Sequence, residues 1–192
     1  SPEELLRYAQ RVRGLLDDEP VAWTVELKID GVAASIRYED GRLVRAVTRG
    51  DGRVGADITH NIRTVVDLPL QLSGNPPPLL EVRGELYMNN SALVQLNQEQ
   101  EARGESPFAN TRNVTAGSIR LLDARIAATR RMRIFCHGLG AVEGLQTTTH
   151  LEFLDQLRSF GLPCTPFVAR SPNMRTAIDY CDELIGQLHD LD

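Results

Sequence analysis

The chain has 192 residues, of which 42% are hydrophobic and 24% charged, and its net charge is −5. This composition is typical of a globular protein, and the negative balance argues against a protein that coats nucleic acid over its whole surface. No apolar run approaches the roughly 20 residues that span a bilayer. The three cysteines, Cys136, Cys164 and Cys181, lie far apart, which predicts reduced core thiols in a cytoplasmic protein and argues against a zinc site.

A helix and then a strand are the first predicted elements. Ser1-Pro2-Glu3-Glu4 is typical of a helix start, and Leu5, Ala9, Val12 and Leu16 follow at helical spacing. Residues 24–31 read Thr-Val-Glu-Leu-Lys-Ile-Asp-Gly and alternate with the period of a strand. Trp23, Val25, Leu27 and Ile29 then share one face, and Glu26, Lys28 and Asp30 share the other. Such a face is either a solvated strand edge or a row of functional groups, and this pattern alone leaves both open.

A hairpin is predicted next, with strands over 32–38 and 43–48 joined by a turn at Asp40-Gly41. Residues 50–55 contain the pattern G-x-G-x-x-G, which in a dinucleotide-binding fold follows a parallel strand and opens an apolar helix. Residues 56–63 are too polar and too short for that helix. We therefore interpret the glycines as a loop that lets the backbone approach a ligand, with Arg49 placed to meet an anion.

A further strand is predicted over 80–87, with Glu81, Arg83, Glu85 and Tyr87 on one side. Two strands with charged faces predict a polar cleft lined by paired charges. A helix over 92–103 follows. Residues 108–120 predict a capped turn that runs into a short helix, with Arg112 and Arg120 about two turns apart on nearly one face.

Six arginines and a single acid, Asp123, fall between residues 108 and 133. This local excess fits either a phosphate contact or a solvated helix face. A buried strand is expected over 132–139, and a capped helix from Thr149 to Phe160. A last helix opens at Ser171-Pro172, and its predicted inward residues are Ile178, Cys181, Ile185 and Leu188. The histidines at 60, 137, 150 and 189 do not cluster, which favours surface or capping roles over metal binding.

Residues 26–31, Glu-Leu-Lys-Ile-Asp-Gly, resemble the K-x-D-G signature of covalent nucleotidyltransferases, which include DNA ligases, RNA ligases and capping enzymes. The segments 46–52, 55–59, 81–85 and 108–120 resemble, in order and spacing, the adenylation domain of the bacterial NAD-dependent DNA ligases. The resemblance covers essentially the whole chain, 1–192. It implies an α+β fold with antiparallel sheets around a nucleotide cleft and flanking helices, the ATP-grasp-like fold of covalent nucleotidyltransferases.

The resemblance also implies roles for single residues. Lys28 would attack the α-phosphorus of NAD, become AMP-lysine and release nicotinamide mononucleotide (NMN), before AMP passes to the 5′-phosphate of nicked double-stranded DNA and the nick is sealed. Asp30 would position this lysine or a magnesium ion. Glu26 would face the adenine, Arg49 the ribose and phosphate, and Glu85 the ribose hydroxyls. Arg112 and Arg120 would grip the DNA backbone.

These roles agree with the chemistry of a lysine nucleophile. An amine attacks only when it is neutral, whereas a free lysine is protonated at neutral pH. A magnesium ion beside the lysine would favour the neutral amine by like-charge repulsion and would neutralise charge on the phosphate. The metal ligands stay unassigned.

The resemblance stops before two later strands of the family that carry lysines. It also includes no helical NMN-binding domain, OB-fold, zinc finger or helix-hairpin-helix region. We therefore expect a fragment that does not seal nicks alone, from a cytoplasmic, monomeric enzyme of DNA replication and repair without a membrane partner. The alternatives are an ATP-dependent polynucleotide ligase, against which segments 50–59 and 108–120 argue, and a non-catalytic nucleic-acid-binding module that would tolerate loss of Lys28.

Overall fold

A computed structural model describes residues 1–50 and 54–187 and divides them into two compact units. Residues 1–28 and 165–187 form one, which we call the terminal unit because it joins both ends of the described chain. Residues 29–164 form the other, which we call the central unit. The described helices include none that is long and apolar enough to cross a membrane.

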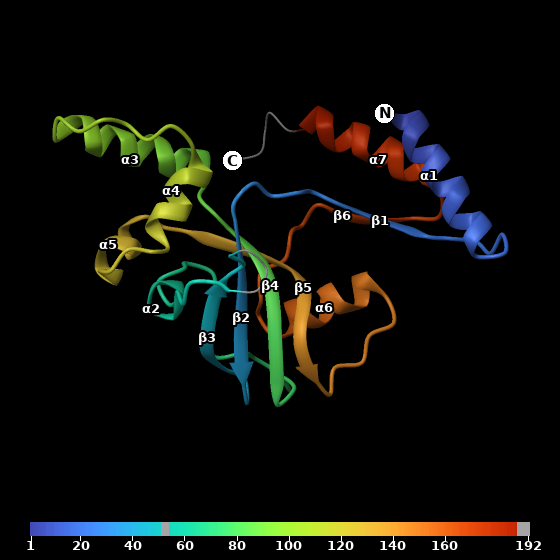
Figure 1. Cartoon of the computed structure of the whole chain (residues 1–192), viewed down its shortest axis with the longest axis horizontal. Helices are drawn as coiled ribbons and strands as arrows, with labels where there is room; N and C mark the ends of the chain where they lie inside the picture. Colours follow the sequence, from blue (N-terminus) through green and yellow to red (C-terminus); the bar gives the residue numbers. More distant parts are fainter. Residues whose placement is uncertain (51–53, 188–192) are drawn as a thin grey trace. The chain divides into compact units, whose positions relative to one another are not determined.

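The terminal unit packs two helices and a two-stranded sheet. Its elements are α1 (Pro2–Leu15), β1 (Trp23–Glu26), β6 (Val168–Ser171) and α7 (Met174–Gln187), drawn in blue and red in Figure 1. β1 and β6 pair antiparallel, with Trp23 opposite Ser171. A small core of Ala9, Met174 and Ala177 holds the helices, and Trp23 packs against it from β1.

Two details of this unit differ from the sequence-based expectation. β1 ends at Glu26 and does not run to Gly31, because its partner β6 has only four residues. Ala9 of α1 is buried and Ile178 of α7 packs against the core, but Ile185 is 61% exposed and Leu5 and Leu16 are also exposed, so each helix turns only part of its predicted apolar face inward. Leu188, also predicted to face inward, lies outside the described residues.

The central unit is built on a four-stranded antiparallel sheet in the order β3-β2-β4-β5, seen in Figure 1. Its strands are β2 (Val32–Glu39), β3 (Arg42–Thr48), β4 (Leu79–Tyr87) and β5 (Arg133–Glu143). Alternate side chains of β2, of β4 and of the first residues of β5 are buried, and Ile36, Leu80, Val82, Leu86 and Ile134 are completely so. The predicted alternation of β4 is thus confirmed, and one face of the sheet stays available for polar groups.

The β2–β3 hairpin turns at Asp40 and Gly41, which both have positive φ, at 47° and 74°. Consecutive strands joined this way are antiparallel, so the glycine-rich stretch does not belong to a parallel dinucleotide-binding unit. The helix after it, α2 (Thr59–Ile62), has only four residues. Residues 51–53 of this stretch lie outside the described part of the chain.

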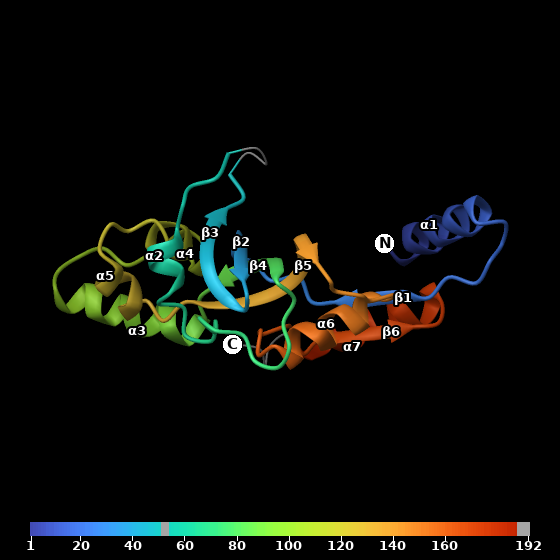
Figure 2. The ribbon, with the colours of Figure 1, turned by 90° about the horizontal axis from the view of Figure 1, so that it is seen from below.

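Helices flank the central sheet. α3 (Asn90–Ala102), α4 (Thr111–Ser118) and α5 (Ala124–Thr129) gather with α2 at one end of the sheet, and α6 (His150–Ser159) packs on β5, as Figure 2 shows. The predicted capping box of α6 is present at Thr149 and Glu152. α5 was not predicted. Because α4 ends at Ser118, Arg120 lies beyond it, and the expected helix face shared with Arg112 is wrong.

The described structure is therefore an α+β fold with antiparallel sheets and flanking helices.

Candidate functional site

Glu26 and Lys28 lie in the terminal unit, at and just beyond the end of β1. Both side chains are exposed, whereas Val25, which precedes Glu26, and Leu27, which lies between Glu26 and Lys28, are half-buried. The Leu27 N–H donates to the Phe167 carbonyl at 3.1 Å, so the backbone next to Lys28 is held although the strand has ended. The alternation predicted from the sequence therefore continues to Lys28, and its amine faces away from the apolar side of the segment.

Asp30 and Gly31 lie in the central unit, where the chain enters β2 beside β4. Val32 is opposite Leu86 in the register. A Cβ atom on Gly31 would lie 2.0 Å from the Leu86 carbonyl oxygen and 3.1 Å from Cγ of Glu85. Only glycine permits this approach, and it brings the residue next to Asp30 against the strand that carries Glu85.

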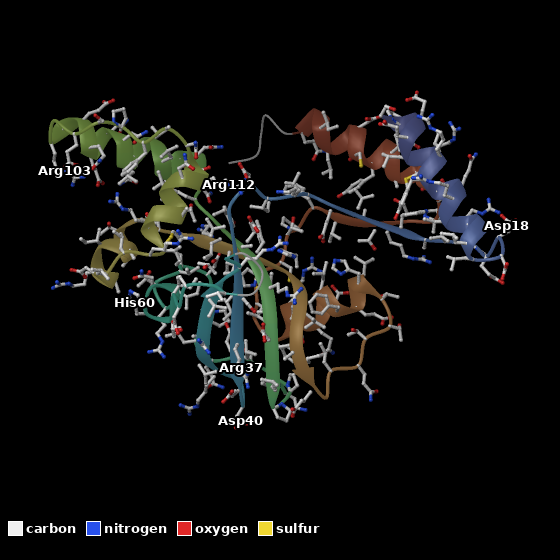
Figure 3. The ribbon with its side chains drawn as sticks, viewed as in Figure 1. Asp18, Arg37, Asp40, His60, Arg103 and Arg112 are labelled. Atoms are coloured by element: carbon white, nitrogen blue, oxygen red, sulfur yellow. The ribbon has the colours of Figure 1, made fainter. Side chains whose placement is uncertain are left out.

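Asp30 forms an ion pair with Arg112 from α4, with Nη1 and Oδ1 3.0 Å apart. Both side chains are exposed, by 70% and 60%, and Figure 3 labels Arg112. The structure thus joins two predicted site residues that are 82 positions apart in the sequence. Nothing in the sequence indicates this contact, since the resemblance assigns Asp30 to the nucleotide step and Arg112 to DNA.

A hollow of about 540 Å³ lies over the polar face of the central sheet. Larger hollows lie elsewhere on the chain, but this one gathers charged and hydrogen-bonding groups from four strands. Its polar lining residues are Ser35, Thr48, Arg49, Glu81, Arg83 and His137. Its volume falls within the range of about 300–1,000 Å³ found for small-ligand sites.

The charged groups of the hollow are held by their neighbours. The Ser35 hydroxyl donates to the Glu81 carboxylate, and Gly140 lies so close that a Cβ there would be 2.6 Å from Glu81. The Arg49 N–H donates to the Ala33 carbonyl at 3.0 Å, which places Arg49 directly after β3 at the rim. Guanidinium groups beside a carboxylate and hydroxyls suit a ligand that combines an anion with hydroxyl groups.

Glu85 lies on the same strand and the same face as Glu81 and Arg83, and it is half-buried. Its register partners are Ala33 on β2 and Phe135 on β5, and the next side chain on this face, Tyr87, stacks on Phe135 with ring centroids 5.0 Å apart. The polar face of β4 therefore carries, in order, the carboxylate of Glu81, the guanidinium of Arg83, the carboxylate of Glu85 and the ring of Tyr87. This row is one of the two charged rows that the sequence predicts; the other begins in the terminal unit with Glu26 and Lys28, so a cleft lined by both strands stays a prediction.

Sequence reasoning missed Arg83 and His137 as candidate site residues. Arg83 stood in the predicted charged row, so the alternation of β4 could have identified it. His137 was expected to have a surface or capping role, and its neighbour Cys136 is fully buried. Because successive strand residues point to opposite faces, the buried cysteine places the histidine on the polar face.

The base of the glycine-rich loop beside the hollow is fixed by Asp57 and Thr59. The Asp57 carboxylate accepts hydrogen bonds from the Thr59 hydroxyl at 2.7 Å and from the Thr59 N–H at 2.9 Å, which lowers the pKa of Asp57. The Thr59 hydroxyl in turn accepts from the Ala46 N–H of β3 at 2.9 Å. The residues that follow the glycine-rich loop are thus held against β3.

Most arginines of the basic stretch already have partners. Arg112 pairs with Asp30, Arg125 with Asp123 and Arg133 with Asp67. Arg130 lies over the Phe108 ring, 5.4 Å from its centroid, and burial lowers the pKa of its guanidinium. Arg120 is exposed in the turn between α4 and α5. The stretch is therefore not one continuous cationic face.

Comparison with known proteins identifies the family. A model of the NAD-dependent DNA ligase adenylation domain matches residues 1–192. The chain is 48% identical over 202 residues to a DNA ligase of Rhodopirellula baltica, and the match covers 100% of this chain and 29% of that protein. DNA ligases of Bdellovibrio bacteriovorus and Carboxydothermus hydrogenoformans are 49% and 45% identical over 85% and 94% of this chain, and 24% and 27% of those proteins.

The chain therefore spans about a quarter of the length of the relatives that it matches. The family match extends over every residue of the chain, including both units of the structure. It also contains each of the predicted site residues, from Glu26 to Arg120. By this match, the chain belongs to the family of NAD-dependent DNA ligase adenylation domains.

Proposed function

We propose that the chain is the adenylation core of a longer NAD-dependent DNA ligase, one similar in length to the relatives that the chain matches. The observation that carries this proposal is the family match over residues 1–192, within which Lys28 is exposed between Glu26 and Asp30. In the proposed reaction the neutral Lys28 amine attacks the α-phosphorus of NAD. A P–N bond forms, the P–O bond to NMN breaks, and the amine loses a proton. AMP then passes to the 5′-phosphate of nicked DNA, and the 3′-hydroxyl displaces it to seal the nick.

We assign the nucleotide to four side chains. Glu26 accepts a hydrogen bond from the adenine amino group, and Glu85 accepts from the ribose hydroxyls. Arg49 donates to the ribose and phosphate, as its place on the rim of a hollow rich in hydrogen-bonding groups supports. His137 lines the same hollow and adds an aromatic ring with a donor and an acceptor. Asp30 positions Lys28 or a magnesium ion.

The donor set fits magnesium. This ion binds oxygen ligands, commonly one or two carboxylates together with substrate phosphates. Asp30 offers an exposed carboxylate, and the Gly31 approach brings Glu85 close to the same segment. A bound magnesium ion would supply charge neutralisation at the phosphate and favour the neutral amine. Arg112 pairs with Asp30 in the structure, so it would compete with a bound magnesium ion for the Asp30 carboxylate.

For the later steps we assign Arg112 and Arg120 to the phosphate backbone of nicked double-stranded DNA. Guanidinium groups are suited to phosphate contacts, which position a protein on DNA without reading its sequence.

We further propose the nucleotidyltransferase, ATP-grasp-like fold for the whole adenylation domain. The enzyme would act as a cytoplasmic monomer in DNA replication and repair, with NMN-binding, OB-fold, zinc-finger and helix-hairpin-helix regions outside residues 1–192, and this chain alone would not seal nicks.

The test is formation of the lysine adduct in the full-length ligase. The protein is incubated with magnesium and NAD labelled in its AMP part, or with labelled ATP, and the protein-bound label is measured after denaturation. We expect label from NAD alone and none on Lys28→Ala or Lys28→Arg. Label from ATP would favour the ATP-dependent ligase, and label that persists on Lys28→Ala would refute the assignment. Full function without Lys28 would instead support a non-catalytic binding module.

A further inference from the structure

Two side chains of α2 hold the backbone on both sides of Arg120. The Asn61 amide nitrogen donates to the Ile119 carbonyl at 2.8 Å and to the Leu121 carbonyl at 2.7 Å. The His60 Nε2 atom lies 2.9 Å from the same Leu121 carbonyl, and Figure 3 labels His60 beside the end of the sheet. Arg120 is the residue between these two carbonyls, so its backbone is fixed by a segment nearly 60 positions earlier.

The hydrogen bonds of Asn61 show that its amide serves as a donor. Asn61 is completely buried, and both hydrogens of its amide group point to the carbonyls around Arg120. Its amide oxygen is also buried and accepts no hydrogen bond from the described residues. An unsatisfied buried acceptor costs about 1–3 kcal/mol. An apolar residue would avoid this cost, but it could not hold the two carbonyls.

The segment that Asn61 holds begins at the fully buried Ile119 and becomes exposed at Arg120 and Leu122. α4 ends at Ser118, and the Arg120 N–H reaches only the Gly117 carbonyl, at 3.3 Å. Leu122 is 98% exposed, so this turn gains little from apolar burial at its tip. At its far end, the Asp123 side chain caps α5 by accepting from the Arg125 N–H. The turn from residue 119 to residue 122 is therefore anchored at both ends and presents Arg120 from a fixed backbone.

We propose that Asn61, assisted by His60, is a positioning residue for the contact of Arg120 with the phosphate backbone of nicked DNA. This inference rests on the DNA role proposed above for Arg120. Binding that must first order a flexible turn loses part of its favourable free energy to that ordering. A backbone held before DNA arrives avoids this loss, so Asn61 acts on DNA binding without touching DNA. It has no part in the reaction of Lys28 with NAD.

The experiment is a double-mutant cycle in the full-length ligase with Asn61→Ala, Arg120→Ala and both together. The dissociation constant for nicked duplex DNA is measured at fixed salt, and adduct formation from NAD is measured without DNA. We expect Asn61→Ala to weaken DNA binding about tenfold, a change of 1.4 kcal/mol. In the Arg120→Ala background it should change binding less than about twofold. Adduct formation by Asn61→Ala should stay within about twofold of the wild type.

Tyr38→Phe is the matched control, because it also removes a buried side-chain donor to a backbone carbonyl, that of Pro69 at 2.8 Å, and not to one beside Arg120. It should lower stability without weakening DNA binding. His60→Ala removes one exposed contact and serves as the second variant if Asn61→Ala does not fold, with a smaller loss expected in the same cycle. Two outcomes would overturn this inference and leave the proposed function intact. One is that the effects of Asn61→Ala and Arg120→Ala on DNA binding are fully additive, and the other is that Asn61→Ala lowers DNA binding and adduct formation equally. Unchanged DNA binding by Arg120→Ala would also remove the proposed role of Arg120.

Discussion

At the residue scale, Gly31 makes the K-x-D-G segment fit its surroundings. It is buried at the start of β2, and the Leu86 carbonyl occupies the space in which any other residue would place its Cβ. The obstacle is backbone of a central strand, which cannot rotate away as a side chain can. The glycine is therefore required by the fold as well as by the site, because it lets the chain pass from Lys28 to β2 beside Glu85.

We expect Gly31→Ala to lower the free energy of unfolding by about 3 kcal/mol or more, since the new methyl group must displace the backbone of β4. Urea unfolding followed by circular dichroism measures the change. Gly117→Ala is the control in the same unit, because a Cβ there would meet no atom within 4 Å. That variant should be neutral or more stable by up to about 1 kcal/mol. Equal stability of the two variants would contradict the close approach at Gly31.

The ion pair between Asp30 and Arg112 marks the limit of sequence reasoning at this scale. The resemblance identifies both residues, yet nothing in either segment indicates that α4 delivers its arginine to the start of β2. That contact depends on how α4 packs against β2 and β4. Because both side chains are exposed, the pair contributes at most about 1 kcal/mol to stability. Under the proposed function, Arg112 would compete with magnesium for the Asp30 carboxylate.

At the element scale, local signals predicted most helices and strands but not their lengths. The β2–β3 hairpin and α6 follow from turn and capping residues alone, and both are confirmed. β1 is shorter than its alternating pattern, because a strand extends only as far as a partner accompanies it. α5 was not predicted, because its six residues are too few to show a helical period in the sequence.

The cap of α6 leads to a prediction about pH. The Glu152 carboxylate accepts hydrogen bonds from the Thr148 hydroxyl and N–H and from the Thr149 N–H, which lowers the pKa of Glu152. A lowered folded-state pKa adds stability above the unfolded value of about 4.3, and that stability disappears as the pH falls through the folded-state value. Urea midpoints should therefore drop more between pH 7 and pH 3 for the wild type than for Glu152→Gln.

The opposite end of the same capping box provides the control. Thr149→Ala removes the hydroxyl that accepts from the Glu152 N–H at 3.2 Å, and it should cost about 1 kcal/mol at both pH values. Its pH dependence should stay close to that of the wild type, because a hydroxyl does not titrate in this range. Equal pH dependence of the wild type and Glu152→Gln would mean that the hydrogen bonds of Glu152 do not add stability.

At the scale of the whole molecule, the two units differ in how the chain builds them. The central unit is one continuous segment, 29–164, with its own sheet and its own buried residues, whereas the terminal unit combines two distant segments. A length of 192 residues by itself predicts one large domain or a domain with a helical appendage. The division could not be read from the sequence, because no linker or change of composition marks residue 28 or residue 165.

Because the central unit is continuous, we expect residues 29–164 to fold when expressed alone. Unfolding in urea should be a single cooperative transition, and the amide spectrum should be well dispersed. Ile36→Asp, which buries a charge in the middle of β2, is the control that should abolish both. Since this segment excludes Lys28, it should take up no label from NAD. A poorly dispersed spectrum would mean that the central unit depends on the terminal segments.

The pairing of β1 with β6 also orders events while the ribosome makes the protein. β1 is translated before the central unit, whereas Val168–Ser171 follow only after the entire central unit has been synthesised. A nascent chain that ends at residue 164 thus already carries Lys28, the proposed nucleophile, yet lacks the strand that pairs with β1 and aligns the backbone leading to it. Lys28 therefore reaches its supported backbone only after the ribosome has passed the central unit.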